Sequence, residues 1–419
     1  MRRRPGRRQP FGPAIWACLL VSTLVVLPTA TARADVTGPS AMGHLLAKRI
    51  EDRRIGSDVG MIVIDAATGQ ELWSHQPDRL LQPASNMKIV TSVTTLATVG
   101  PGHRFPTAVV QGPGPRHVIV QGGGDPLLTR ANLDDLARRT AHHYSRGTRV
   151  IVHVDGDLFP PASRAPGWVA AYLGNSTGLV QALGIHGDLS SHPSRDAVEY
   201  FAGRLHALGL RPSIAGNLDA TPGAAVLATY RGHTAADAIA RMLSMSDSGV
   251  AEVLFRQVAL AAGRLPTWAG SQRAAREVLA SLGVDASGMV LVDGSGLSRK
   301  DRISPRFLAH VLRVARVEQA PRFAAMFRPH AMPIAGRTGT LGLRYARYSA
   351  GPSRCARGRV QAKTGTILGT IALSGLAAPK SSGERIFSVL INRRPARYSA
   401  LDTRHAVDGL AATVVGCWG

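Results

Sequence analysis

Pro83-Ala84-Ser85-Asn86-Met87-Lys88 is the stretch on which the fold assignment of this chain depends. It stands at the start of a segment, residues 85–98, that is predicted to be helical. A residue three positions after a serine lies about 4.5 Å further along a helix and on the same face. Lys88 can therefore reach the Ser85 hydroxyl, and an uncharged lysine can take its proton as a general base.

The lysine is informative because this chain of 419 residues prefers arginine strongly, with 45 Arg and 5 Lys among its 50 basic residues. Arginine stays protonated and cannot serve as a base. A Ser-x-x-Lys spacing alone is nevertheless a weak signal. In the alternative structural interpretation, Ser85 caps the helix and Lys88 is a solvated side chain.

Lys363-Thr364-Gly365-Thr366 is a second candidate motif, between two predicted strands. In the functional interpretation it belongs to an edge strand that lines a cleft. Lys363 then supplies positive potential, Thr364 binds a carboxylate, and the backbone N–H of Thr366 faces an oxyanion. In the structural interpretation the motif is a turn in which Gly365 takes a positive φ angle.

Ser246-Asp247-Ser248 lies between two predicted helices. Its functional interpretation is that the Ser246 hydroxyl relays protons between the nucleophilic serine and the lysines. The alternative is a helix–helix loop with capping residues. A further run, Arg337-Thr338-Gly339-Thr340, is similar to the Lys-Thr-Gly motif but lacks the lysine, so we predict a loop outside the chemistry.

The remaining sequence predicts an α/β fold of the α+β kind, with helices flanking an antiparallel sheet formed from both chain ends. Strands of this sheet are predicted at 59–66, 71–75, 359–364, 369–376 and 385–393. Short strands and turns from residue 104, followed by an irregular Gly-, Pro- and Ser-rich stretch, predict a smaller, strand-rich inserted domain at 104–190. The catalytic domain is then formed by residues 35–103 and 191–419.

Residues 1–34 are predicted to be a signal peptide. A basic start precedes the apolar run Ala14–Val26, and Ala32-Arg33-Ala34 fits a cleavage site. We therefore expect export to the cell envelope, the periplasm or the medium. In such a compartment Cys355 and Cys417, the two cysteines that remain, either form a disulfide or stay as free thiols.

The charge balance is strongly basic, at +23 for the whole chain. Without residues 1–34 there remain 44 basic and 27 acidic residues, a net charge of +17. A basic surface suits anionic cell-wall polymers. Export and the lack of an aromatic-basic stripe argue against nucleic-acid binding.

The order Ser-x-x-Lys, Ser-Asp-x and Lys-Thr-Gly resembles that of the penicillin-recognising serine acyl-transferases. The chain resembles in particular the class C low-molecular-mass penicillin-binding proteins, which are D-alanyl-D-alanine carboxypeptidases and endopeptidases. The resemblance covers nearly all of the mature chain. It also rests on Gly122 to Pro126, Ala165-Pro166-Gly167-Trp168, Thr267-Trp268-Ala269-Gly270-Ser271, Asp293-Gly294-Ser295-Gly296-Leu297-Ser298-Arg299 and Ala335 to Leu341.

This resemblance implies a transpeptidase-like domain with an insert between the first two motifs. It implies that Ser85 attacks the penultimate D-Ala of a peptidoglycan stem peptide, with Lys88 and Ser246 handling protons. Lys363, Thr364, Gly365 and Thr366 form the substrate-binding strand, with the Ser85 and Thr366 backbone N–H groups at the oxyanion. β-Lactams are expected to acylate the same serine, and no metal or organic cofactor is required.

Ser248 departs from the family pattern, which has asparagine at this position. A serine cannot replace both ends of an amide that holds the substrate peptide. A catalytically weakened penicillin-binding wall protein is therefore an alternative, and a secreted serine β-lactamase is a second one, against which the long insert argues. The sequence leaves open the balance of carboxypeptidase and endopeptidase activity and the oligomeric state.

Overall fold

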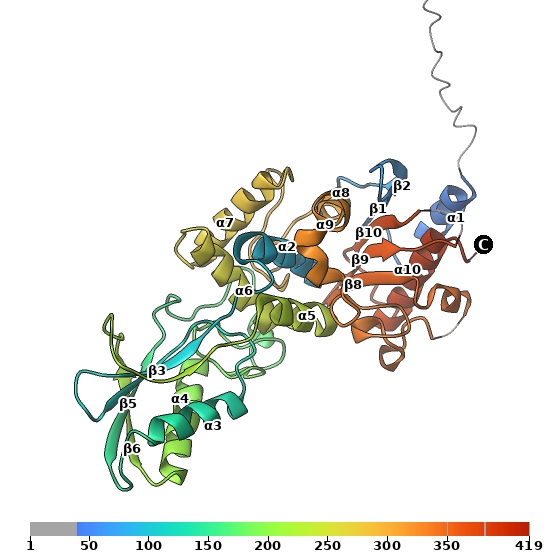
Figure 1. Cartoon of the computed structure of the whole chain (residues 1–419). Coiled ribbons are helices and arrows are strands. Elements are labelled where there is room, and N and C mark those ends of the chain that lie inside the picture. The colour runs from blue at the N-terminus through green and yellow to red at the C-terminus, as the bar shows by residue number, and fades with distance from the viewer. Residues whose placement is uncertain (1–39, 350, 381–382, 419) are drawn as a thin grey trace, which may run out of the picture. The chain divides into compact units, whose positions relative to one another are not determined.

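The computed structural model describes residues 40–349, 351–380 and 383–418 (Figure 1). The predicted signal peptide, residues 1–34, lies outside the described residues. Within the described part, none of the helices has the length and apolar character that crossing a membrane would need. Two five-stranded sheets organise this part of the chain.

The first sheet is antiparallel, with strand order β2-β1-β10-β9-β8. Its strands are β1 (Val59–Asp65), β2 (Glu71–His75), β8 (Val360–Ile367), β9 (Thr370–Ala377) and β10 (Arg385–Ile391). Strand β1 pairs with β10, so both ends of the chain contribute to one sheet, as predicted. Strand β8 is at the edge and carries the Lys-Thr-Gly motif.

Helices cover both faces of this sheet because its strands alternate apolar side chains between two cores. Val63 and Phe387 pack with helices α1 (Ala41–Ile50) and α10 (Ala400–Val415). Ile62 and Ile386 belong to the opposite core. That core is formed with helices α2 (Met87–Val99), α5 (Ala235–Met245), α6 (Ser248–Ala261), α7 (Trp268–Ser281), α8 (Pro305–Arg313) and α9 (Ala320–Phe323).

The second sheet is mixed, with strand order β6-β5-β4-β3-β7. Its strands are β3 (Thr107–Gln111), β4 (His117–Gln121), β5 (Arg149–Asp155), β6 (Arg211–Asn217) and β7 (Val226–Tyr230). Strands β4, β5 and β6 run parallel, and β3 pairs antiparallel with β4 and β7. Helices α3 (Arg130–Ala141) and α4 (Pro193–Ala207) pack against it through a separate apolar core.

The strand pairing contradicts a boundary of the insert at residue 190. Helix α4 and strands β6 and β7 belong to the second sheet, although residues 191–230 were expected in the catalytic domain. The sequence did not indicate β6 because none of its residues is buried, which removes the apolar alternation of a strand. Arg104 and Thr234 pair with each other. We therefore propose that the insert extends from residue 104 to about residue 233.

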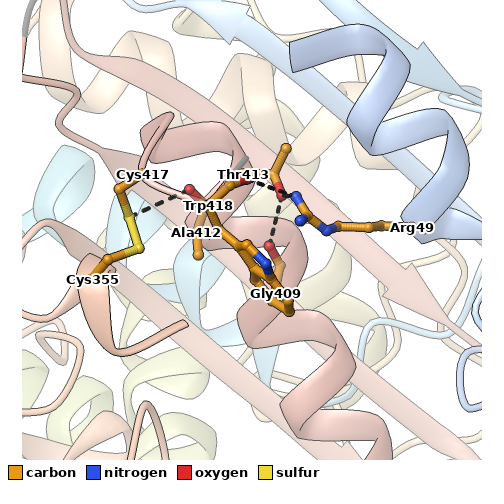
Figure 2. Close-up of a disulfide and its surroundings, with 7 residues drawn as sticks. All are labelled: Arg49, Cys355, Gly409, Ala412, Thr413, Cys417 and Trp418. Carbon is orange, nitrogen blue, oxygen red and sulfur yellow. Dashed lines mark hydrogen bonds between the residues drawn. A yellow bond between two sulfur atoms is a disulfide. The ribbon is translucent and has the colours of Figure 1, made fainter. Parts of the chain in front are cut away.

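A disulfide joins the C-terminal end to the 3₁₀ turn Pro352–Ala356 (Figure 2). Of the two possibilities for the cysteines, the structure shows the bridge, with Cα atoms of Cys355 and Cys417 5.8 Å apart. Beside it, the guanidinium carbon of Arg49 lies 4.1 Å from the centre of the Trp418 ring. Arg49 also donates to the Trp418 carbonyl at 2.9 Å and to the Thr413 hydroxyl.

Candidate active site

Ser85 and Lys88 meet at the start of α2, as the helix geometry predicted. Ser85 lies in a short 3₁₀ turn, Ala84–Asn86, that leads directly into the helix. Lys88 Nζ donates to Ser85 Oγ at 2.9 Å. The Lys88 side chain is fully buried, and Ser85 makes no cap to the helix. Both parts of the alternative structural interpretation are therefore wrong.

Three acceptors surround the ammonium group of Lys88. Besides Ser85 Oγ, it donates to the Ser295 carbonyl at 2.9 Å and to Ser248 Oγ at 3.3 Å. Burial lowers the pKa of Lys88 to about 8, although the carboxylates of Glu252, Asp293 and Asp247 oppose this shift. A lysine with such a pKa is partly neutral near physiological pH and can accept a proton.

The Ser-Asp-Ser motif is a tight connection between α5 and α6. Ser246 ends α5 with a left-handed φ of 61°. Asp247 then caps α6 by accepting from the Val250 N–H at 3.2 Å. Burial would raise the pKa of Asp247, but hydrogen bonds from His186 and the Val250 N–H lower it to about 2. The ionised carboxylate thus stabilises the loop between α5 and α6. Ser248 is the first residue of α6.

Lys363 on β8 connects the third motif to the second. Its Nζ donates to Ser246 Oγ at 2.9 Å and to the Thr364 carbonyl at 2.8 Å. The side chain is fully buried, and burial together with the charge of Lys88 lowers the pKa of Lys363 well below its usual value. Each lysine therefore contacts one serine of the Ser-Asp-Ser motif, which brings the three predicted motifs into one site.

Gly365 lies inside strand β8 and not in a turn, so the alternative interpretation of this motif is wrong. Glycine is required there by close approach. An added Cβ would lie 3.0 Å from the Pro83 carbonyl oxygen and 3.1 Å from Asn86 Nδ2. Asn86 Nδ2 also donates to the Lys363 carbonyl at 3.0 Å, which ties β8 to the turn that carries Ser85.

The Arg-Thr-Gly-Thr run, predicted to be a loop outside the chemistry, contacts the Lys-Thr-Gly motif through Thr340. Thr340 Oγ1 lies 2.7 Å from Thr364 Oγ1, so the two hydroxyls share a hydrogen bond. Thr340 belongs to a 3₁₀ turn, Gly339–Leu341. Two sequence signals pointed to this run: its likeness to the Lys-Thr-Gly motif and the family resemblance over Ala335 to Leu341. On the other side of the motif, Arg404 of α10 donates to Thr366 Oγ1 at 3.3 Å.

A cavity of about 280 Å³ adjoins the hydroxyls of Ser246 and Ser248. Its opposite wall comes from residues 176–189, in the insert. His186 of this wall lies 3.0 Å from Asp247, so the insert also contacts the Ser-Asp-Ser motif. A hollow beside reactive hydroxyls is where a substrate is expected to bind.

Comparison with known proteins identifies relatives along nearly the whole chain. The model of the D-Ala-D-Ala carboxypeptidase 3 (S13) family matches residues 43–177 and 188–414. Carboxypeptidase DacB of Mycolicibacterium smegmatis is 31% identical over 412 residues, which cover 91% of this chain and 86% of that protein. The D-alanyl-D-alanine carboxypeptidase of an Actinomadura species is 28% identical, over 93% of this chain and 89% of that protein.

The fold is shared with a solved structure, that of penicillin binding protein 4 from Haemophilus influenzae. The superposition has a TM-score of 0.72 at 18% sequence identity and covers 88% of this chain and 98% of the other. At this identity the likeness concerns the fold alone. The same protein has also been solved in complex with a β-lactam.

Proposed function

This chain belongs to the D-Ala-D-Ala carboxypeptidase 3 (S13) family, and we propose that Ser85 is the nucleophile with which it cleaves peptidoglycan stem peptides. It is a serine-type D-Ala-D-Ala carboxypeptidase and penicillin-binding protein. The observation that supports the role of Ser85 best is its 2.9 Å hydrogen bond to Lys88, a buried lysine whose pKa is lowered to about 8.

Acylation begins when neutral Lys88 takes the proton of Ser85 Oγ. The oxygen attacks the carbonyl of the penultimate D-Ala, and the backbone N–H groups of Ser85 and Thr366 stabilise the resulting oxyanion. The C–N bond to the terminal D-Ala then breaks, and the leaving nitrogen receives, through Ser246, the proton that Lys88 took from Ser85, which leaves Lys88 neutral again. Its hydrogen bond to Lys363 makes Ser246 suited to this relay.

Deacylation repeats the sequence with water. Lys88, again neutral, takes a proton from the water that attacks the Ser85 ester, and the serine leaves with its proton restored. A β-lactam forms the same ester with Ser85, but the nitrogen released when its ring opens stays covalently attached to the acyl group. β-Lactams are therefore expected to form a long-lived acyl-enzyme at Ser85.

The terminal carboxylate of the substrate is held by β8 in this proposal. The hydroxyls of Thr364 and Thr340 face each other at 2.7 Å and can both turn to donate to a carboxylate. Lys363, on the same strand, supplies positive potential to this carboxylate. Since its pKa is lowered by burial and by Lys88, an arriving anion favours its protonated form.

A catalytically weakened penicillin-binding wall protein remains the second candidate, and Ser248 is the observation behind it. Ser248 Oγ still lies within 3.3 Å of Lys88 Nζ, so the acceptor that the lysine needs at this position is present. This contact favours an active enzyme. The net charge of +17 after removal of residues 1–34 is consistent with work beside anionic wall polymers.

Labelling with a fluorescent penicillin tests the proposal, together with D-Ala release from a pentapeptide. We expect the wild type to label and to release D-Ala, and Ser85→Ala to do neither. Lys88→Arg should also fail, because arginine cannot accept the serine proton. Lys48→Arg, a matched change on α1 away from the site, should behave as wild type. Labelling of Ser85→Ala would overturn the assignment, and a wild type that labels without releasing D-Ala would favour the second candidate.

A further inference from the structure

The Asp-Gly-Ser-Gly-Leu-Ser-Arg run forms a buried turn directly beneath Lys88, and the mechanism above uses none of its side chains. Two of its carbonyls face α2. The Ser295 carbonyl accepts from Lys88 Nζ at 2.9 Å, and the Gly294 carbonyl accepts from Thr91 Oγ1 at 2.6 Å. The position of this turn therefore decides where the ammonium group of Lys88 is held.

Glu252 fixes the turn from the other side. Its two carboxylate oxygens accept from the Gly294 and Ser295 N–H groups, each at 2.9 Å. The side chain is fully buried on α6. It lies one helical turn after Ser248, and residues four apart share a face of a helix. One face of α6 thus carries both the hydroxyl that contacts Lys88 and the carboxylate that holds the turn beneath it.

The other buried acids near the turn have different roles. Asp293 accepts from the Gly296 and Ser298 N–H groups and from Trp168 Nε1, all at 2.7 Å. Burial and the proximity of Asp293 raise the pKa of Asp301 well above its usual value, and Asp301 accepts from the Val292 N–H at 2.7 Å.

The charged groups that act on Lys88 are therefore few. The acids are Glu252 and Asp247 on α6 and Asp293 in the turn, and the cation is Lys363 on β8. Lys88 is in turn the cation that acts on Glu252, whose pKa burial and the charge of Asp293 raise to about 8.

We propose that Glu252 is a positioning residue for acylation. By holding the Gly294 and Ser295 N–H groups, it keeps the Ser295 carbonyl against Lys88, and in its ionised form it places a negative charge near that lysine. This inference rests on the proposed roles of Ser85 and Lys88. Glu252 itself touches neither the substrate nor the reacting atoms.

Removal of the Glu252 charge should change both the position and the proton affinity of Lys88. Glutamine has one acceptor oxygen, so one of the two N–H groups loses its partner and the turn shifts. When it is ionised, Glu252 also opposes the fall in the pKa of Lys88, so its loss lowers that pKa further at the pH values where the wild-type carboxyl is charged. More of the lysine is then neutral at a given pH. The acid limb of the pH–rate profile, which is the range where the acylation rate rises with pH toward its plateau, therefore moves to lower pH.

The test is the second-order rate of acylation by a fluorescent penicillin, measured on the full chain across about pH 6 to 10. We expect the wild-type acid limb near the Lys88 pKa of about 8. In Glu252→Gln the limb should move down by about one pH unit and the plateau rate should fall about tenfold. Glu252→Asp, which keeps the charge, should leave the limb where it is in the wild type.

Asp301→Asn is the matched control, because Asp301 is buried near the turn but is not among the groups that shift the pKa of Lys88, so the limb should not move. An unmoved limb in Glu252→Gln, or an equal shift in Asp301→Asn, would refute the inference. If Glu252→Gln does not fold, Thr91→Val removes the other bond to the turn without a charge, and an unchanged plateau there would count against it. Labelling of Ser85→Ala would instead signal failure of the proposed function.

Discussion

At the scale of single residues, Ser248 is the clearest departure from the family pattern. Its hydroxyl lies 3.3 Å from Lys88 Nζ and is almost fully buried at the start of α6. It provides the acceptor that the lysine requires. Unlike the family asparagine, however, serine has no amide NH₂ group that could donate to the substrate backbone while its oxygen accepts from Lys88. The substitution is therefore expected to affect peptide turnover more than acylation by a β-lactam.

Ser248→Asn tests this expectation. The amide oxygen can accept from Lys88 while the NH₂ group donates to the peptide, so kcat/KM for D-Ala release from a pentapeptide should rise about fivefold, on the order of 1 kcal/mol for one added hydrogen bond. Ser248→Ala, which lacks an acceptor for Lys88, should lower the rate of penicillin labelling. A fall in kcat/KM in Ser248→Asn would mean that the adjoining cavity is shaped for serine.

At the scale of secondary-structure elements, α10 holds the first sheet together at its C-terminal side. It packs in the core that contains β1, β9 and β10. Asp408 of this helix forms a buried ion pair with Arg347. The disulfide between Cys355 and Cys417 then fastens the end of the helix to a short 3₁₀ turn, Pro352–Ala356 (Figure 2).

Loss of the disulfide should lower the free energy of unfolding. The bridge spans 62 residues, and closing a loop of that length is worth about 4 kcal/mol in the chain-entropy model. Thermal unfolding of Cys355→Ser/Cys417→Ser should therefore occur at a clearly lower temperature than in the wild type, with penicillin labelling at room temperature retained. An unchanged melting temperature would show that Arg49 and Trp418 hold the C-terminal end without the bridge.

At the scale of the whole molecule, the chain leaves the catalytic fold once, completes a second sheet and returns. Arg104 and Thr234 pair at this point of exit and return. The insert has its own apolar core, in which Phe201 of α4 is fully buried. It also contributes the wall of the cavity that faces Ser246 and Ser248. The insert thus affects the site through this wall and through the His186–Asp247 contact.

Phe201→Ala should loosen the insert selectively. Such a truncation in a core typically costs about 3–5 kcal/mol. We expect faster amide hydrogen exchange in β3 to β7, with penicillin labelling still detectable. Leu254→Ala, a matched truncation in the core beneath α2, should instead reduce labelling. Equal loss of protection in both sheets of Phe201→Ala would show that the insert is not a separate cooperative unit.

Local features of this molecule could be predicted from the sequence because their causes are local. The contact of Ser85 with Lys88 follows from the rise of a helix over three residues. The Thr234–Asp237 capping box and the Ser304 cap likewise depend only on residues three positions apart. Strand alternation predicted the strands of the first sheet, and β1, β9 and β10 each have one face in each core.

Only the tertiary structure decided the contacts between distant residues. Lys363 reaches Ser246 across 117 positions, and Glu252 reaches the turn at Ser295 across 43. Sheet register and helix packing set these distances, and sequence spacing contains neither. Thr340 was missed for the same reason, whereas β6 was missed because none of its residues is buried. The low pKa values of both lysines also depend on burial, which exists only once the three motifs have come together and excluded water.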